Sequence, residues 1–305
     1  MSDVVVLGSA NVDLVLRVRR IPAAGETVLA TEVDRVPGGK GSNQALAAGR
    51  SGASTRLIGA VGADADGALL RTTLEDSGVD VTTLRELPAP TGLAVVNVAD
   101  SGENSIVVSS GANAMLTDLG DADRTAIADA RVLLGQLETP IETFLAAAAL
   151  ARDSATLVIL NAAPSTTLPE RVWDAVDLLV VNEHEAADLL NDPSAAGDPA
   201  RALDGLLERV GQVVLTLGAA GSRYAARGVP PVDVPAVRVR AVDTTAAGDT
   251  YCGVLAASLA AGSPIDRAAR RASAAASLCV ERHGAAPSIP GRDEIDERLR
   301  AAYGL

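Results

Sequence analysis

Residues 243–249 read Asp-Thr-Thr-Ala-Ala-Gly-Asp, and they lead directly into Thr250-Tyr-Cys-Gly-Val-Leu-Ala-Ala-Ser-Leu-Ala260. The segment before them alternates Val237, Val239 and Ala241 with other residues, which predicts an extended strand. The segment after them is rich in Ala and Leu at helical spacing. A helix that begins near Gly248 would aim its free N–H groups and its positive dipole end at a ligand. The stretch therefore predicts an anion site.

Asp249 is unusual at such a site because its carboxylate competes with an anionic ligand for the same N–H donors. One interpretation is that Asp249 takes a proton from a hydroxyl group, while the N–H groups stabilise the charge on a phosphoryl group in transfer. The alternative is that Asp249 caps the helix and that the small residues only form a tight turn.

The composition excludes several classes of protein. A net charge of −13 argues against nucleic acid or an anionic membrane as a partner. We expect no transmembrane helix, because the chain has no run of 18 apolar residues, and we expect a cytoplasmic protein, because the first residues lack a signal peptide. Cys252 and Cys279 lack the spacing of a metal site, so we expect them to be reduced.

The chain has one lysine, Lys40, beside 25 arginines. It lies in the glycine-rich segment 38–43, Gly-Gly-Lys-Gly-Ser-Asn. Chance is one explanation. The other is a crowded site with glycine walls, which admits a slim ammonium group but not a planar guanidinium.

Short apolar segments alternate with helical ones along most of the chain. We predict strands over 4–8, 55–61, 132–135, 157–160, 178–181 and 213–217. We predict helices over 42–51, 68–77, 139–152, 169–176, 183–190, 200–210, 250–261, 264–281 and 293–302, with Ser42 or Asn43 as the cap of the first. This order is typical of an α/β fold, in which helices cover both faces of a mostly parallel sheet.

Two further regions, 12–33 and 93–109, have amphipathic strands that do not suit the buried centre of that sheet. They predict a small β-layer beside the main body, with one apolar face that covers a site, another subunit or both. We take residues 1–305 as one domain with these strands inserted.

Polar residues follow nearly every predicted strand of the main sheet, where ligands bind in open α/β folds. These residues are Asn11, Asp13, Gln136, Glu138, Asn161, Asn182, Glu183, Glu185 and Thr216. Each could also be an ordinary turn or helix-start residue. Common nucleotide, hydrolase and zinc motifs are missing: the chain has no complete P-loop, no G-x-G-x-x-G after a strand, no G-x-S-x-G and no H-x-x-x-H.

The motifs that remain resemble those of the ribokinase (carbohydrate kinase) family along almost the whole chain. They are Gly-Ser-Ala-Asn-Val-Asp at 8–13, Pro-Ala-Ala-Gly-Glu-Thr at 22–27, the run from Gly38 to Ala53, Gln-Leu-Glu-Thr-Pro at 136–140, Asn-Glu-His-Glu at 182–185, Thr-Leu-Gly-Ala-Ala-Gly at 216–221, residues 243–250 and His-Gly-Ala-Ala-Pro-Ser-Ile-Pro at 283–290. The resemblance implies a three-layer αβα sandwich with a mostly parallel central sheet and a small β-sheet lid.

The resemblance also implies a role for individual residues. Those that would bind the sugar are Asn11, Asp13, Gly39, Lys40, Gly41, Asn43 and Glu138. Asp249 would also contact the sugar and act as the base, and Ala246, Ala247 and Gly248 would donate N–H groups to the γ-phosphoryl group. Those that would bind ATP are Asn182, Thr216, Gly218, Ala219, Gly221, Gly248 and Ser273.

Two cations follow from the same resemblance. Asn182 and Glu185 would act on Mg²⁺ through water. An activating K⁺ would lie in loops that bind it mostly through backbone carbonyls and that contain Asp243, Thr245, Cys279, Arg282, Gly284 and Ser288.

The substrate that the motifs imply is D-ribose, phosphorylated at its 5-hydroxyl by ATP. The first 143 residues contain no aromatic side chain on which a base could stack, which disfavours a nucleoside. 2-Deoxyribose or another sugar remains an alternative, and so does a sugar sensor that has lost catalysis. The resemblance and the alternating strands together predict a homodimer that associates through the β-layer.

Overall fold

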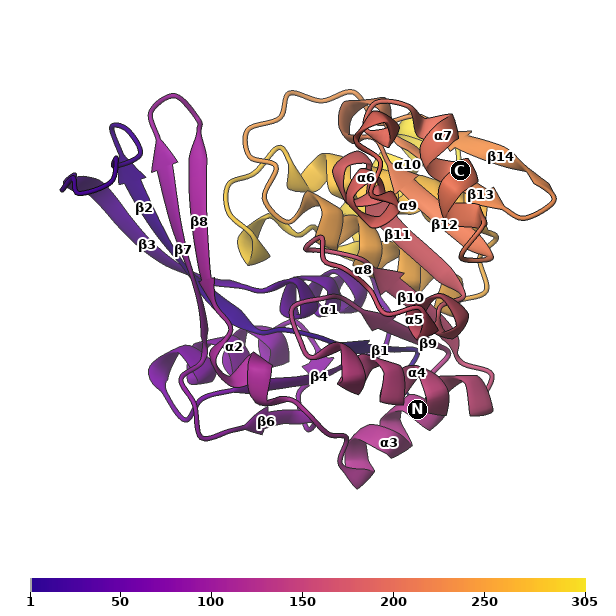
Figure 1. Cartoon of the computed structure of the whole chain (residues 1–305), viewed down its shortest axis with the longest axis horizontal. Helices are drawn as coiled ribbons and strands as arrows, with labels where there is room; N and C mark the ends of the chain where they lie inside the picture. The colour runs from indigo at the N-terminus through magenta and orange to yellow at the C-terminus, as the bar shows by residue number, and fades with distance from the viewer. Residues whose placement is uncertain (1) are drawn as a thin grey trace.

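The computed structural model describes residues 2–305, and a large sheet lies at its centre (Figure 1). The strand order is β14-β13-β12-β11-β10-β9-β1-β4-β5, and β6 pairs with β4. The strands are β1 (Val4–Leu7), β4 (Thr55–Val61), β5 (Val79–Asp80), β6 (Leu84–Glu86), β9 (Val132–Gly135), β10 (Leu157–Asn161), β11 (Leu178–Asn182), β12 (Gln212–Thr216), β13 (Ser222–Ala226) and β14 (Val229–Val234). All pair in parallel except β13 and β14, which extend one edge in antiparallel fashion.

Helices cover both faces of this sheet. One face packs against α1 (Lys40–Arg50), α2 (Ala65–Asp76), α8 (Ala247–Ala260), α9 (Ile265–Cys279) and α10 (Arg292–Tyr303). The other packs against α3 (Asp121–Ala128), α4 (Ile141–Asp153), α5 (Arg171–Ala175), α6 (Glu183–Leu190) and α7 (Pro199–Leu207). In β1, Val4 and Val6 join the first core while Val5 and Leu7 join the second. Burial on both faces explains the continuous apolar strands and confirms the predicted three layers.

A second sheet stands away from this body, and we call it the lid (Figure 1). Its order is β3-β2-β7-β8, with bounds β2 (Asn11–Val18), β3 (Ala30–Gly38), β7 (Gly92–Ala99) and β8 (Asn104–Ser109). The small β-layer is therefore confirmed. The predicted region 12–33 ends too early, because β3 runs on until Gly38 pairs with Asn11 at the base of the lid.

Two local predictions are wrong. Residues 235–246 form no strand; the N–H groups of Val242 and Asp243 donate to the carbonyl of Val280 instead, which ties the segment to the end of α9. Neither Ser42 nor Asn43 caps α1, which begins at Lys40 after Gly39. The Ser42 hydroxyl donates back to the carbonyls of residues 38 and 39 instead.

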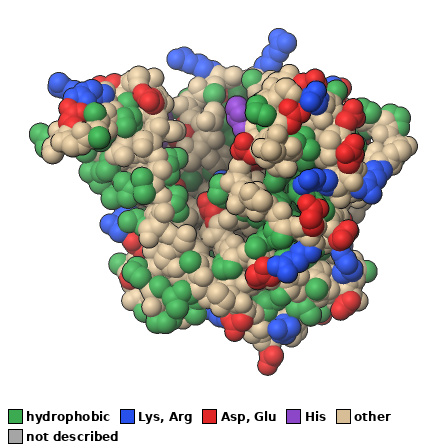
Figure 2. All heavy atoms as spheres, viewed as in Figure 1, with side chains coloured by type: hydrophobic (Ala, Val, Ile, Leu, Met, Phe, Trp, Pro, Cys, Tyr) green, Lys and Arg blue, Asp and Glu red, His purple; other side chains and the backbone are tan. Residues whose placement is uncertain are grey.

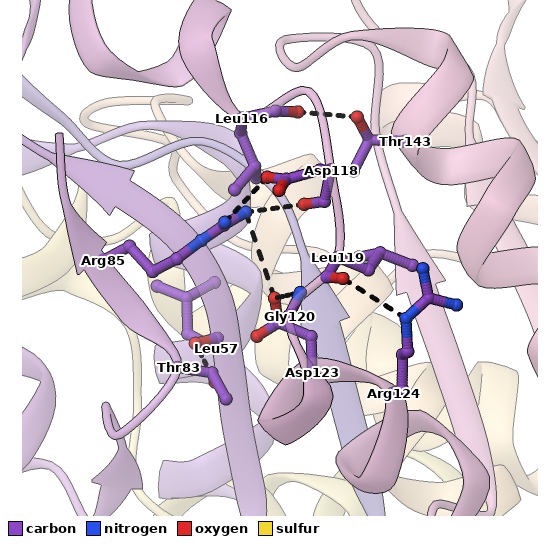
Figure 3. A network of polar contacts seen from close by, with 10 residues as sticks. All are labelled: Leu57, Thr83, Arg85, Leu116, Asp118, Leu119, Gly120, Asp123, Arg124 and Thr143. Carbon is purple, nitrogen blue, oxygen red and sulfur yellow. Dashed lines mark hydrogen bonds and ion pairs between the residues drawn. The ribbon is translucent and has the colours of Figure 1, made fainter.

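A polar network fixes the chain that leads into α3 (Figure 3). Arg85 of β6 donates to the carboxylate of Asp118 at 2.8 Å and to its carbonyl at 2.6 Å. The buried carboxyl of Asp123 accepts from the N–H of Gly120 at 2.9 Å and caps α3. Burial raises the pKa of Asp123, with Arg85 opposing the shift. The network holds the segment after the short 3₁₀ helix η1 (Gly111–Met115), which supplies a residue to the site described below.

None of the helices described for residues 2–305 combines the length and the apolar character that a membrane crossing requires.

Candidate functional site

The anion site predicted from residues 243–249 forms at the start of α8, but the N–H of Ala247, one of its three predicted donors, is used within the turn. Ala246 is the N-cap of α8 and has φ of 59°, a left-handed conformation that is rare for a residue with a side chain. The N–H of Ala247 donates to the carbonyl of Thr244 at 3.2 Å. Within residues 2–305, the N–H groups of Gly248 and Asp249 have no acceptor. Two donors at the positive end of the helix therefore remain for an anion.

Asp249 does not cap the helix, so the capping alternative is wrong. Its side chain is buried in the first turn, and its two carboxylate oxygens accept from α1. Oδ2 accepts from the Asn43 Nδ2 at 3.0 Å, and Oδ1 accepts from the Gln44 Nε2 at 3.0 Å. Sequence reasoning singled out Asn43 but missed Gln44, although Gln44 follows it directly in the same motif.

Gln44 belongs to a chain of buried amides that ends on the main sheet. Its Oε1 accepts from the Gln136 Nε2 at 2.6 Å, and its Nε2 donates to the Asn161 Oδ1 at 3.0 Å as well as to Asp249. The Asn161 Nδ2 donates in turn to the carbonyl of Val180 at 3.2 Å. Because each amide is oriented by its neighbour, Gln44 has to present N–H groups to Asp249.

Glycines make room for the polar side chains at the base of the lid. Asn11 lies between Gly38 and Gly92 in the sheet register. A Cβ atom on Gly92 would lie 2.0 Å from the Asn11 Oδ1, and one on Gly38 would lie 2.4 Å from a carboxylate oxygen of Asp13. The Asn11 Oδ1 accepts from the Asn113 Nδ2 at 2.7 Å. Asn113, carried by η1, was not predicted, because an isolated Asn gives no sequence signal.

Glu138 holds the glycine-rich segment against the first strand. Its Oε2 accepts from the N–H of Lys40 at 3.0 Å and from the Ser9 hydroxyl. Gly39 has φ of 89°, and a Cβ atom on Gly41 would lie 2.5 Å from the backbone N of Ser9. Lys40 therefore does lie in a crowded segment with glycine walls, as one of the two sequence explanations proposed.

The charges of this region interact strongly. Burial, together with the nearby carboxylates of Glu138 and Asp249, raises the pKa of Asp13 to about 7, although the charge of Lys40 opposes the shift. Burial opposes the charge of Lys40, but Asp249, Glu138 and Glu185 outweigh burial and raise its pKa. Lys40 therefore remains a cation among carboxylates.

Figure 2 shows a hollow between the lid and the body. A cavity of about 390 Å³ is lined there by Asn11, Asn113 and Glu138, and by Val108 from the lid. Its size and its mixture of apolar and convergent polar groups suit a small polar molecule.

Asn182 and Glu185 form a reciprocal cap at the start of α6. The N–H of Glu185 donates to the Asn182 Oδ1 at 2.8 Å, and the N–H of Asn182 donates to the Glu185 Oε2 at 2.8 Å. Burial raises the pKa of Glu185, while the N–H of Asn182 and the charge of Lys40 lower it. Within residues 2–305 no group of three or more His, Cys, Asp or Glu side chains could hold a metal directly.

The predicted nucleotide residues lie at the edge of the sheet beyond this cap. Thr216 is paired with Asn182 at the ends of β12 and β11, and a 3₁₀ turn, η3 (Gly218–Ala220), follows. Gly221 has no space for a side chain, because a Cβ atom would lie 2.1 Å from the carbonyl oxygen of Val234. Ser273 is buried on α9, where its hydroxyl is bonded to that of Tyr303 at 3.0 Å.

The residues predicted for K⁺ come together from two loops. These residues are Asp243, Thr245, Cys279, Arg282, Gly284 and Ser288. The Asp243 carboxylate accepts from the N–H of Thr245 and from the N–H of Gly284, each at 2.9 Å, and these bonds lower its pKa despite partial burial. The Cys279 Sγ lies 3.0 Å from the Ser288 hydroxyl and donates to the Thr245 carbonyl at 3.5 Å.

Comparison with known proteins fits this geometry. The model of the pfkB family of carbohydrate kinases matches residues 1–292. The chain belongs to the pfkB family of carbohydrate kinases. The sequence resemblance, the fold and the class of enzyme predicted from it are therefore confirmed.

Relatives of this carbohydrate kinase are similar over nearly its whole length. It is 38% identical to the ribokinase of Schizosaccharomyces pombe, over 97% of each chain, and 38% identical to that of Bacillus subtilis, over 98% of this chain and all of the relative. The structure of Arabidopsis thaliana ribokinase complexed with ribose and ATP superposes with a TM-score of 0.92 at 33% identity, covering 98% of this chain and 99% of that one. The roles of the individual site residues stay predictions.

Proposed function

We propose that this carbohydrate kinase is a ribokinase, which transfers the γ-phosphoryl group of ATP to the 5-hydroxyl of D-ribose. Its similarity to ribokinases over the whole chain supports the proposal, as does the Arabidopsis structure complexed with ribose and ATP. The observation that carries it is the position of Asp249, whose carboxylate lies beside two free N–H donors at the start of α8. A base and an anion site at one point suit phosphoryl transfer to a hydroxyl group.

In the proposed reaction, Asp249 takes the proton of the 5-hydroxyl as its oxygen attacks the γ-phosphorus. The bond from that phosphorus to the bridging oxygen breaks, and ADP leaves. Asn43 and Gln44 hold the carboxylate through one hydrogen bond to each of its oxygens. The N–H groups of Gly248 and Asp249 stabilise the charge on the phosphoryl oxygens, with Ala246 turning the chain so that they point outward.

The sugar would lie in the cavity beneath the lid. Asn11 and Glu138, which line this cavity, would bind hydroxyl groups of the sugar. Asp13, Lys40 and Asn43 would bind others, and the glycines at 39 and 41 let the backbone come close. Val108 of the lid covers the apolar side of the ring.

Mg²⁺ and K⁺ are proposed cofactors of the reaction. Mg²⁺, held through water by Asn182 and Glu185, would neutralise charge on the ATP phosphates. Asn182 and Glu185 fit a hydrated ion, because each uses one side-chain oxygen in the reciprocal cap and a carboxylate oxygen of Glu185 remains for a water ligand. We expect Glu185→Gln to raise the Mg²⁺ concentration needed for half-maximal activity, and an unchanged requirement would contradict this role.

We take residues 1–305 as one kinase domain into which the lid strands are inserted, and we propose that it works in the cytoplasm. Cys252 and Cys279 are both unpaired and buried, which suits a reducing compartment. Fractionation of cells that make the protein would test this location.

The experiment that tests the proposed function is an ADP-release assay with ATP and Mg²⁺. The candidate substrates are ribose, 2-deoxyribose, fructose, fructose 6-phosphate and adenosine. The unaltered enzyme is compared with the Asp249→Asn variant. We expect the highest kcat/KM with ribose and a loss of kcat of at least about a hundredfold in the variant, without a change in its melting temperature that would indicate misfolding. Preference for another compound would overturn the substrate, and full activity of the variant would overturn the mechanism.

We also propose that the lid associates with the lid of a second copy of this chain. The strand pairing places Leu14, Leu16, Val33, Val95 and Val107 on the side opposite Asp13 and Val108, which face the site. This apolar side is open: Val33 is 57% exposed and Val107 is 66% exposed. A sheet that exposes an apolar face and a long edge strand is a docking surface.

Sedimentation at micromolar concentration tests this association. We expect a dimer for the unaltered protein and a monomer for Val107→Asp. Val229→Asp is the matched control, because Val229 is 54% exposed but lies on the main sheet. A monomeric unaltered protein, or equal dissociation of both variants, would contradict the proposal.

A further inference from the structure

A second and larger cavity lies at the other end of the sheet. Its volume is about 560 Å³, within the range of small-molecule sites. Asp3 and Arg131 line it, and they immediately precede β1 and β9 at their amino ends, whereas the kinase site lies at the carboxyl ends. The ends of α1 and α8 remote from the kinase site also line it, through residues 51–53 and 257–261.

Arginine dominates the lining of this cavity. Its arginines are Arg131, Arg267, Arg271, Arg292 and Arg300. The two aspartates that line it are Asp3 and Asp296, which leaves a surplus of three positive charges among the side chains. That surplus lies in a chain whose net charge is −13.

The two aspartates lie close to only three of the five arginines. The Arg131 Nε lies 3.9 Å from Asp3, while the Arg271 Nε lies 3.0 Å and the Arg292 Nε 3.7 Å from Asp296. Within residues 2–305, the guanidinium groups of Arg267 and Arg300 make neither a hydrogen bond nor an ion pair. Two guanidinium groups at the cavity are therefore unpaired.

Helix ends explain two of the arginines but not the others. Arg271 donates to the carbonyl of Ser51 after α1 at 3.0 Å, and Arg131 donates to the carbonyl of Ala260 at the end of α8 at 2.9 Å. Such bonds satisfy the free carbonyls of a helix C-terminus. They leave Arg267, Arg292 and Arg300 without a comparable role.

We propose that this cavity binds a small phosphorylated molecule that carries at least two negative charges. Guanidinium groups match phosphate oxygens in pairs, and several of them border this half-open cavity. The cavity is larger than a single phosphate needs, so the ligand is either a free polyphosphate or a phosphorylated metabolite. The inference does not depend on the sugar that the kinase site accepts.

Calorimetric titration of the full chain tests the proposal. The protein is first saturated with ribose and ADP without Mg²⁺, so that the kinase site is occupied. Pyrophosphate is the probe for a free polyphosphate, and fructose 1,6-bisphosphate is the probe for a metabolite. We expect saturable one-site binding of at least one probe, weakened at least about tenfold in Arg267→Gln/Arg300→Gln, and weakened also by added salt.

The matched control is Arg19→Gln/Arg238→Gln, which removes two exposed arginines that lie outside the cavity. Both double variants change the net charge equally, and Arg267 and Arg300 are exposed at the rim, so we expect neither variant to unfold. Absence of saturable binding of both probes up to about 10 mM, or equal weakening in the two double variants, would overturn the proposal.

Discussion

Gln44 donates a hydrogen bond of 3.0 Å to Asp249, although 205 residues separate them in the sequence. The bond joins the first turns of α1 and α8, the two helices that carry the glycine-rich segment and the anion site. Because Gln136 and Asn161 orient the amide from behind, Gln44 acts as a positioning residue for the proposed base.

Replacement of Gln44 by Glu places a second carboxyl group against Asp249. A neighbouring like charge raises the pKa of a carboxyl group. We therefore expect the acidic side of the plot of kcat against pH to move to higher pH, and kcat at pH 7 to fall by about tenfold to a hundredfold. Gln44→Leu removes the hydrogen-bond donor without adding charge, so we expect kcat to fall with a smaller shift of its pH dependence. Identical profiles for both variants and the unaltered enzyme would show that Gln44 has no positioning role.

Gly92→Ala is expected to damage sugar binding specifically. The added Cβ would lie 2.0 Å from the Asn11 Oδ1 and 2.4 Å from the Asn113 Nδ2, so both amides have to move. We expect the KM for ribose to rise at least about tenfold, with a smaller change in the KM for ATP. Gly211→Ala is the control, since a Cβ there meets no atom within 4 Å. A ribose KM that is equal in both variants would refute this account of Gly92.

The binding of ribose is expected to depend on pH through Asp13. Its pKa is about 7, and ionised carboxylates accept stronger hydrogen bonds from hydroxyl groups than neutral carboxyls do. We therefore expect the KM for ribose to fall as the pH rises through 7, and Asp13→Asn to have a higher KM with a flatter profile. An Asp13→Asn enzyme that keeps the full pH dependence would assign the effect to another group.

The raised pKa of Asp13 also predicts how the stability of the protein depends on pH. A carboxyl whose pKa is raised on folding binds its proton more tightly in the folded state, so its contribution to stability is present below the ordinary pKa of 3.8 and is lost as the pH rises to about 7. At pH 8 the ionised Asp13 is therefore destabilising. We expect Asp13→Asn to raise the melting temperature at pH 8 more than at pH 5. Equal shifts at the two values of pH would contradict the raised pKa.

Stimulation by K⁺ is expected to depend on Asp243. Its carboxylate joins the two loops by accepting from Thr245 and Gly284, so Asp243→Ala releases them. We expect the variant to lose the increase in kcat that KCl gives over choline chloride at equal ionic strength. Arg282→Gln is the control, because the Arg282 side chain points to Glu294 and the predicted ligand is its backbone. Unchanged stimulation in Asp243→Ala would exclude this cation site.

Much of the fold follows from local patterns in the sequence. Strands such as β1 and β9 are apolar at every position, because both faces of the main sheet are buried. Strand β2 alternates instead, because the two faces of the lid are only partly buried. Strand β13, next to the edge strand β14, was not predicted, and of the segment 229–241 that was predicted to be extended only 229–234 forms a strand. Pairing at a sheet edge depends on which distant segment is adjacent, and propensity does not contain that information.

For the site, the residue types that carry the chemistry can be recognised in the sequence: Asp249 after small residues, Lys40 among glycines, and acids and amides after the strands. Which of these residues meet depends on how the chain folds. The hydrogen bonds of Gln44, Gln136 and Asn113 have no sequence signal, because a buried amide looks like any polar helix or loop residue until its partner is known. The surplus of arginines in the second cavity likewise arises from segments far apart in the chain, since charge accumulates in space and not along the sequence.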